Sequence, residues 1–211
     1  MARIYCSGPL FCAEEVGGMT AIAQTLEHAG YDTFLPHRDG LEPYVLRFGG
    51  SALPSLLPGV RGGVDYAIFA LDVYELIERC DAVVCNLNGR VPDEGMVVEA
   101  SIAFAVGKPV VLYKADSRAP FGGHDNAMLT ALARGGIEDR IDRLPARLQQ
   151  AMDEGGAPGT PSPALARAVA DGARIAAVLA RLPAGMGKQR WPDDVVRLVL
   201  AELTDPPVAS R

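Results

Sequence analysis

Glu99 is the only charged residue in the otherwise largely apolar run of residues 96–105, which has the pattern of a helix. Its neighbours three and four positions along are Ile102 and Ala103, so the carboxylate points where apolar side chains point. A carboxylate in such surroundings tends to have a raised pKa and a functional role. A buried ion pair or an interaction with the helix dipole would give the same pattern. Residue types alone leave these interpretations open.

Two further carboxylates, Asp93 and Asp72, are candidates for the same site. Asp93 lies at the expected start of the helix that carries Glu99, where an acidic residue can serve as a simple cap. That helix start follows an apolar strand, and open α/β sheets bind ligands where strands end. Asp72 lies in a helical pattern in which an acidic residue is most often part of a solvated face.

Strand and helix patterns alternate along the elements that must position these residues. We expect strands at residues 3–7, 31–35, 82–87 and 110–113, and helices at residues 13–28, 65–79 and 92–106. Gly30 is expected to end the first helix. This alternation predicts an α/β fold, an open parallel sheet flanked by helices, with its ligand site at the carboxyl ends of the strands.

The remaining segments differ in composition from the alternating elements. Residues 41–64 are rich in glycine and proline, which predicts an irregular loop over the site. Beyond residue 135 the chain is rich in alanine and arginine, with amphipathic helices expected at residues 165–182 and 193–203. We therefore expect an α/β domain over residues 1–135. Residues 136–211 would form a helical extension packed on the same domain or on a neighbouring subunit.

The overall charge argues against polyanionic partners. The chain has 211 residues, with 20 Lys and Arg against 26 Asp and Glu, which gives a net charge of −6. Nucleic acids and anionic membranes require cationic patches, so we expect neither as a partner. The sequence contains neither a long uncharged apolar stretch nor a signal-peptide pattern, so we expect a soluble, cytoplasmic protein.

Cysteine, histidine and glycine spacings give no sign of a metal or a cofactor. The four cysteines do not have the spacing of a redox pair or a zinc site, and we expect buried free thiols at Cys6, Cys12, Cys80 and Cys85. The three histidines are scattered along the chain. The glycine pairs lack the spacing of a dinucleotide or P-loop motif. Asp116 and Arg118 suit a turn with a surface charge pair.

Five sequence blocks together resemble one enzyme family. They are IYCSGPLF at residues 4–11, Asp72 with CDAVV at 80–84, PDEGMVVE at 92–99, GKPV at 107–110 and DNAM at 125–128. In this order they resemble the nucleoside 2-deoxyribosyltransferase family. The resemblance implies a flavodoxin-like sheet. It also implies transfer of 2-deoxyribose between the nucleobases of deoxynucleosides through a covalent sugar–enzyme intermediate, with no cofactor.

The resemblance also implies a role for individual residues. Glu99 matches the family nucleophile, and Asp72 matches the carboxylate that handles the proton of the base. Tyr5 matches the tyrosine that orients the nucleophile, whereas Asp93 and Asn126 match the groups that hold the sugar 5′-hydroxyl. In the family this asparagine comes from a neighbouring subunit. The resemblance therefore implies a homo-oligomer that takes a deoxynucleoside and a free nucleobase as substrates.

Three functions remain open at this stage. A related branch hydrolyses deoxynucleoside 5′-monophosphates and has a serine near the position of Asp93. A carboxylate there would repel a phosphate, so we expect free nucleosides as substrates. Transfer and hydrolysis share the glycosyl-enzyme, which leaves an N-glycoside hydrolase as an alternative. A non-catalytic nucleoside- or nucleotide-binding module is the other alternative, although burying three carboxylates without catalytic use would cost stability.

Overall fold

The computed structural model describes residues 1–45, 58–118, 124–133, 136–156, 159–182 and 192–203. The chain divides into two compact units, each made of two separate stretches. Unit 1 comprises Met1–Leu35 and Arg79–Thr160, and unit 2 comprises Pro36–Glu78 and Pro161–Arg211. The boundary expected at residue 135 does not coincide with this division, because part of the C-terminal region packs on the sheet of unit 1.

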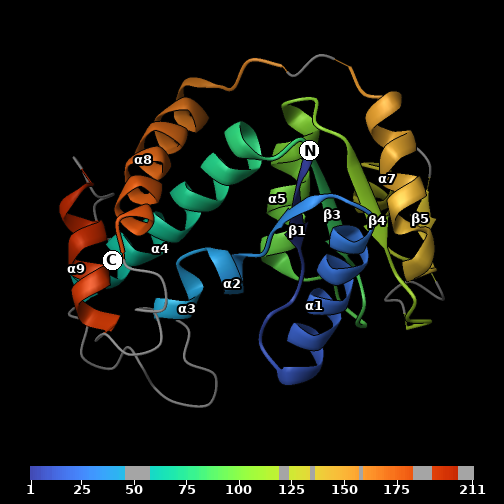
Figure 1. Ribbon diagram of the computed structural model, residues 1–211, viewed down its shortest axis with the longest axis horizontal. Coiled ribbons are helices and arrows are strands. Elements are labelled where there is room, and N and C mark those ends of the chain that lie inside the picture. Colours follow the sequence, from blue (N-terminus) through green and yellow to red (C-terminus); the bar gives the residue numbers. More distant parts are fainter. Residues whose placement is uncertain (46–57, 119–123, 134–135, 157–158, 183–191, 204–211) are drawn as a thin grey trace. The chain divides into compact units, whose positions relative to one another are not determined.

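Unit 1 is built on a five-stranded parallel sheet in the order β2-β1-β3-β4-β5 (Figure 1). Its strands are β1 Arg3–Ser7, β2 Asp32–Phe34, β3 Ala82–Asn86, β4 Val110–Tyr113 and β5 Ile137–Glu138. Its helices are α1 Ala13–His28, α5 Glu94–Ala105, α6 Ala127–Thr130, the short 3₁₀ helix η2 Ile141–Arg143, and α7 Leu144–Asp153. This strand order is that of flavodoxin-like folds, which confirms the predicted open α/β sheet.

Helices cover both faces of the sheet in unit 1. Helices α1 and α7 contact each other and pack on one face, and α5 packs on the other face against β1, β3 and β4. Successive side chains of a strand point to opposite faces, so Ile4 and Cys6 join the core beneath α1 and α7. Tyr5 and Ser7 point to the opposite face, where α5 lies. Alternation within β1 thus selects which of its side chains can reach α5.

The predicted elements of unit 1 are confirmed with small shifts at their ends. Strands β1 and β4 and helix α1 have the predicted bounds. Gly30 has a φ of 91° just after α1, which confirms it as the end of that helix. Strand β5 and helix α6 were not predicted, because elements this short carry no measurable periodicity.

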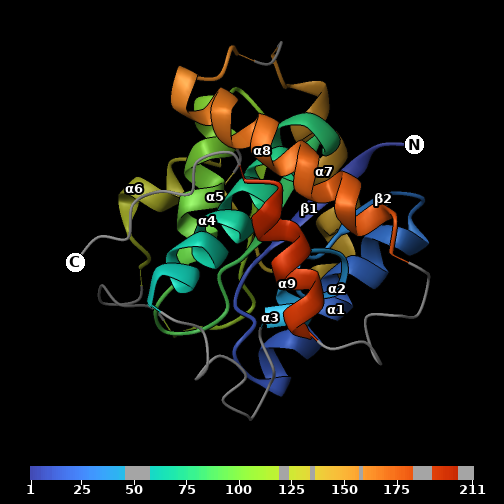
Figure 2. The same cartoon turned by 90° about the vertical axis from the view of Figure 1, so that its left-hand side faces the viewer.

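Unit 2 is helical. It contains α2 Pro36–Asp39, α3 Glu42–Val45, α4 Pro58–Tyr74, most of the π-helix η1 Glu75–Arg79, α8 Pro163–Ala180 and α9 Pro192–Ala201. Helices α8 and α9 confirm the two amphipathic helices expected from the sequence. Figure 2 shows α8 and α4 crossing at close range with α9 beside them. The core of the unit includes Leu71 on α4, Ile175 on α8 and Val199 on α9.

The expectation of an irregular loop over residues 41–64 is wrong at both ends of that segment. Helix α3 occupies Glu42–Val45, and α4 already begins at Pro58. Proline suits the first turn of a helix because its missing N–H would have no partner there. Gly63 lies inside α4, where an added Cβ would come within 2.9 Å of Leu200 Cδ2 on α9. Residues 46–57 of the expected loop lie outside the described residues.

No helix in the described part of the chain is long and apolar enough to cross a membrane.

Candidate functional site

The carboxyl ends of β1, β3 and β4 border a cavity of about 890 Å³ in unit 1. It lies where the strand order reverses between β1 and β3, the place where open α/β sheets bind ligands. Its lining includes Pro9 after β1, Asn86 at the end of β3, Ala115 after β4, and Asp93 and Gly95 at the start of α5. Glu99 is not among the lining residues; it lies one helical turn beyond Gly95.

Two hydroxyl groups from β1 hold the Glu99 carboxylate. Tyr5 Oη donates a hydrogen bond of 2.8 Å to Glu99 Oε1, and Ser7 Oγ donates to Glu99 Oε2. Tyr5 and Ser7 are fully buried, whereas Glu99 is partly exposed. Both hydroxyls reach α5 because residues two apart in a strand share a face. The plane and the position of the carboxylate are therefore fixed by the strand.

The structure brings together Tyr5 and Glu99, two of the residues that the family resemblance singled out, and adds Ser7, which sequence reasoning missed. The available signal was the spacing, since Ser7 lies two residues after Tyr5 in the same strand and so must point the same way. Cys85 pairs with Ser7 in the sheet register. Burial, followed by the nearby Glu99 carboxylate, raises the pKa of the Cys85 thiol well above its usual value. Cys85 thus remains a neutral thiol beside the carboxylate.

The other cysteines are also free thiols. Cys6, Cys80 and Cys85 are buried, as expected. Cys12 is exposed, and the expectation that it is buried is wrong because it lies at the N-cap of α1, outside the sheet. No group of three or more histidine, cysteine, aspartate or glutamate side chains in the described residues is arranged to hold a metal ion.

Asp93 is the N-cap of α5 and part of the cavity wall. Its Oδ2 accepts a hydrogen bond of 2.8 Å from the backbone N–H of Met96. This contact confirms the capping role that the sequence suggested. The same carboxylate lines the cavity, so capping and ligand binding are compatible uses of one side chain.

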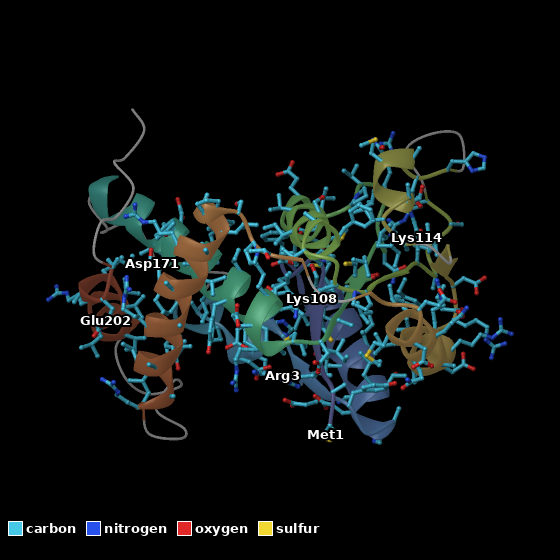
Figure 3. The ribbon with its side chains drawn as sticks, turned by 90° about the horizontal axis from the view of Figure 1, so that it is seen from above. Met1, Arg3, Lys108, Lys114, Asp171 and Glu202 are labelled. Atoms are coloured by element: carbon cyan, nitrogen blue, oxygen red, sulfur yellow. The ribbon has the colours of Figure 1, made fainter. Side chains whose placement is uncertain are left out.

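Asn126 is the N-cap of the short helix α6, and its Oδ1 accepts a hydrogen bond of 2.9 Å from the N–H of Met128. The side chain is exposed and is not among the described residues that line the cavity of unit 1. Its neighbour Asp125 forms an ion pair of 2.6 Å with Lys114, and both side chains are almost completely buried. Lys114, labelled in Figure 3, follows β4, so the ion pair ties the start of α6 to the sheet.

The loops after β3 and β4 are joined by hydrogen bonds at the cavity. Asn88 Oδ1 accepts from the N–H groups of Ala115 and Asp116, and Asp116 accepts from the N–H of Gly89. Arg118 forms an ion pair with Asp116, as the sequence suggested, and its hydrogen bonds hold the pKa of the Asp116 carboxyl well below its usual range. Nothing in the sequence pattern singled out Asn88.

Asp72 lies on α4 in unit 2 and is 9% exposed. The solvated helix face that its position suggested is therefore wrong, because α4 packs against α8. Its side chain is hydrogen-bonded to that of Glu42, the first residue of α3, which is 6% exposed. Burial raises the pKa of Glu42 to about 7. Sequence reasoning missed Glu42, since it lies in the segment that was expected to be a loop.

A family model described as nucleoside 2-deoxyribosyltransferase matches residues 4–128, more than half of the chain. The chain belongs to the nucleoside 2-deoxyribosyltransferase family. The match contains every residue that the resemblance singled out: Tyr5, Asp72, Asp93, Glu99 and Asn126.

Solved structures show the same fold. A conserved protein from Enterococcus faecalis V583 is 20% identical with a TM-score of 0.54, and the similarity covers 71% of this chain and 98% of that one. A 2-deoxyribosyltransferase from Bacillus psychrosaccharolyticus is 19% identical with a TM-score of 0.51, covering 68% of this chain and 90% of that one. The comparison with curated proteins gives no match. Membership of the nucleoside 2-deoxyribosyltransferase family thus agrees with the strand order and with the position of the cavity.

Proposed function

We propose that the protein transfers 2-deoxyribose from a free deoxynucleoside to a different nucleobase, through a covalent glycosyl-enzyme on Glu99. The observation that carries the proposal is the Glu99 carboxylate held by Tyr5 and Ser7 next to the carboxyl edge of the sheet. A carboxylate fixed in this way needs little reorganisation to approach a sugar carbon. Membership of the nucleoside 2-deoxyribosyltransferase family supports the same chemistry.

In the first half-reaction, an oxygen of Glu99 attacks C1′ of the deoxyribose while the C1′–N bond to the base breaks. The transition state has oxocarbenium character, which the nearby negative charge stabilises and then traps as an ester. Asp72, in its acid form, gives a proton to the leaving base. The two carboxyl groups thus divide the work between attack on the sugar and departure of the base.

In the second half-reaction, a ring nitrogen of the acceptor base attacks C1′ and the ester bond to Glu99 breaks. Asp72 takes the proton that the acceptor loses, as microscopic reversibility requires. Negative charge returns to the Glu99 oxygens, where the hydroxyl groups of Tyr5 and Ser7 can stabilise it by hydrogen bonding. These two hydroxyl groups therefore assist the breakdown of the intermediate as well as the placement of the nucleophile.

Sugar binding involves the 5′-hydroxyl. In this proposal Asp93 accepts a hydrogen bond from it, and Asn126 of a neighbouring subunit completes the contact, which makes the active protein a homo-oligomer. The exposure of Asn126 at the start of α6 supports a role toward another subunit.

Free nucleosides are the proposed substrates because carboxylates predominate around the cavity. Its lining contains Arg90 and Arg118 as cations, and Arg118 is engaged by Asp116. The carboxylates of the lining are those of Glu14, Glu15, Asp93, Glu94 and Asp116. A phosphate dianion would meet Coulomb repulsion from these groups that is strong at short range. Turnover of a deoxynucleoside 5′-monophosphate faster than that of the deoxynucleoside would contradict this choice.

The test is an incubation of the purified protein with a deoxynucleoside donor and a different free base, followed by chromatography. A new deoxynucleoside is the expected product. Glu99→Ala should lose the activity, and a covalent adduct of one deoxyribose should be visible by mass spectrometry of the wild-type protein without an acceptor. Deoxyribose and free base without the new nucleoside would indicate a hydrolase, and no reaction would favour a binding module.

A further inference from the structure

Unit 2 buries two carboxyl groups in direct contact. Glu42 at the start of α3 is 6% exposed, Asp72 on α4 is 9% exposed, and their side chains are hydrogen-bonded to each other. Ionised carboxylates contain no hydrogen-bond donor, so a hydrogen bond between two carboxyl groups requires a proton on one of them. Two adjacent carboxylates in a buried site also repel each other, which favours retention of one proton by the pair.

The local backbone is built to place the Glu42 carboxyl. The backbone N–H groups of Leu41 and Glu42 donate hydrogen bonds to it, and these contacts lower its pKa against the larger effect of burial. Gly40 precedes them between α2 and α3. A Cβ at Gly40 would lie 2.5 Å from Glu42 Oε2 and 2.6 Å from the carbonyl oxygen of Pro36. The absence of a side chain at this position therefore leaves space for the carboxyl group.

Other charged groups lie on the elements around the pair. On α2, Arg38 and Asp39 form a salt bridge of 2.9 Å with each other, and burial lowers the pKa of His37, which keeps it neutral at pH 7. The remaining titratable or charged residues with described side chains on α3, α4, η1, α8 and α9 are Tyr44, Asp65, Tyr66, Tyr74, Glu75, Glu78, Arg79, Arg167, Asp171, Arg174 and Arg197. The pKa of Glu42 is raised because burial of this carboxyl, which raises the pKa, outweighs the hydrogen bonds, which lower it.

We propose that Glu42 is a positioning residue that shares one proton with Asp72 and thereby holds Asp72 in its acid form for the departing nucleobase. This inference rests on the proposed function and gives a role to Glu42, a residue that the family resemblance did not single out. It also explains how an aspartate, whose ordinary pKa is about 4, can act as an acid near neutral pH. The burial that raises the pKa of Glu42 acts on the same pair.

The proton balance closes over one reaction cycle. When the C1′–N bond of the donor breaks, Glu99 bonds to C1′ and the shared proton moves from Asp72 to a ring nitrogen of the leaving base. The pair then carries two negative charges. When the acceptor attacks C1′ and the bond to Glu99 breaks, the proton lost by the acceptor returns to Asp72. The second carboxylate makes the deprotonated pair a strong base at the moment when a base is needed.

The decisive comparison uses two donors that differ in their need for an acid. 2′-Deoxyadenosine requires protonation of its leaving base, whereas the base of 2′-deoxy-7-methylguanosine is already cationic in the donor and leaves as a neutral molecule without an added proton. We expect Glu42→Gln to lower kcat for 2′-deoxyadenosine by about 10-fold or more, and to change kcat for the cationic donor less than about threefold. Glu78→Gln, the same chemical change at an exposed position of η1, is the matched control.

The pH dependence of kcat distinguishes this role of Glu42 from a merely structural one, which would leave the pH dependence unchanged. With 2′-deoxyadenosine, wild-type kcat should fall as the pH rises through about 7, where the pair of Glu42 and Asp72 loses its shared proton. In Glu42→Gln, the amide donates to the Asp72 carboxylate and favours its charged form, so this alkaline limb should move to lower pH by about one unit or more. An equal loss of kcat in Glu42→Gln with both donors would overturn the proposal. An alkaline limb at the same pH as in the wild-type protein would also overturn it.

A stability measurement tests the shared proton even if the protein transfers no deoxyribose. The pKa of Glu42 is raised from 4.5 to about 7 on folding, so its contribution to stability is complete below pH 4.5 and is lost as the pH rises through 7. The urea midpoint of the wild-type protein should therefore fall relative to that of Glu42→Gln between pH 4.5 and 7. Absence of this difference would overturn the proton pair. An inactive wild-type protein that shows the difference would reject the proposed function alone.

Discussion

At the scale of single residues, the Glu99 carboxylate is held by two hydroxyl groups, those of Tyr5 and Ser7. Tyr5 was expected from the family resemblance, whereas Ser7 emerges only when β1 is built and its alternate side chains are followed. Each occupies a different carboxylate oxygen. The two donors together define the face from which the carboxylate can approach a sugar, because neither oxygen can rotate away without breaking a hydrogen bond.

Replacing these hydroxyl groups tests whether they position the Glu99 carboxylate for the reaction. We expect Ser7→Ala and Tyr5→Phe each to lower kcat by about 10- to 100-fold, since a hydrogen bond to a charged group contributes about 1.5–3 kcal/mol. The measurement is the single-turnover rate of deoxyribosylation of Glu99 and of its reversal by an acceptor base. Ser101→Ala is the matched control, because Ser101 is exposed on α5 and donates to the carbonyl of Val97. A Ser7→Ala variant as active as the control would contradict the role of Ser7.

At the scale of elements, the close contact between α4 and α8 determines how Asp72 is held. Tyr66 on α4 donates a hydrogen bond of 2.6 Å to Asp171 on α8, labelled in Figure 3, and Arg174 pairs with the same carboxylate. Burial and the Asp171 carboxylate raise the pKa of Tyr66 to about 12. Next to Asp171, Gly172 lies so close to α4 that a Cβ would be 2.1 Å from the carbonyl oxygen of Ala70. Helix α8 thus supports the segment that carries Asp72.

Adding a methyl group at Gly172 should push the two helices apart. We expect Gly172→Ala to lower the free energy of unfolding by about 1–3 kcal/mol, the usual cost of overpacking, and to lower kcat because Asp72 follows Ala70 by two residues. Urea titration followed by circular dichroism measures the first effect. Gly17→Ala is the control: a Cβ at Gly17 on α1 meets nothing within 4 Å, so this variant should gain about 0.5–1 kcal/mol. Equal stability of both variants would show that α8 is not tightly packed on α4.

Elements set by neighbouring residues were predicted from the sequence, whereas contacts between residues far apart in the sequence were not. Strand β1, helix α1 and strand β4 were predicted with their bounds, since their signals are local patterns of apolar residues and a terminal glycine. Strand β5 was missed because two residues carry no pattern. Glu42 was missed because its proposed role depends on contact with Asp72, thirty positions away in the sequence. No periodic pattern of residues indicates such a contact. The Tyr5–Glu99 contact came from the family resemblance, not from the residues themselves.

At the scale of the whole molecule, the proposed site requires more than one chain. Asn126 is exposed at the start of α6, and Met128, two residues later, is 82% exposed. The Lys114–Asp125 ion pair holds this short helix against the sheet of its own unit. A rigidly held, exposed asparagine beside an exposed apolar side chain suits a subunit contact, in agreement with the homo-oligomer that we propose.

Mixing two inactive variants should restore activity if Asn126 acts in a neighbouring site. Glu99→Ala lacks the nucleophile, and Asn126→Ala lacks the contact to the 5′-hydroxyl, but a mixed oligomer contains some sites with both residues intact. We expect each pure variant to have about 1% of wild-type activity or less, and the refolded mixture to recover at least about tenfold more. Size-exclusion chromatography with light scattering measures the assembly. A mixture no more active than its parts would place Asn126 in the site of its own chain, or outside any site.

The division of each unit into two stretches of chain has a consequence for biosynthesis. Tyr66 and Asp171 are 105 residues apart in sequence, and the apolar side of α4 is covered by α8 and α9. While the chain emerges from the ribosome, the strands of unit 1 can be complete before α8 has been made. The apolar side of α4 therefore lacks its contacts with α8 and α9 until the last part of the chain has been synthesised. A released chain that ends at residue 160 would contain every strand of the sheet but neither α8 nor α9, so α4 would be the segment on which a chaperone or a protease would act first.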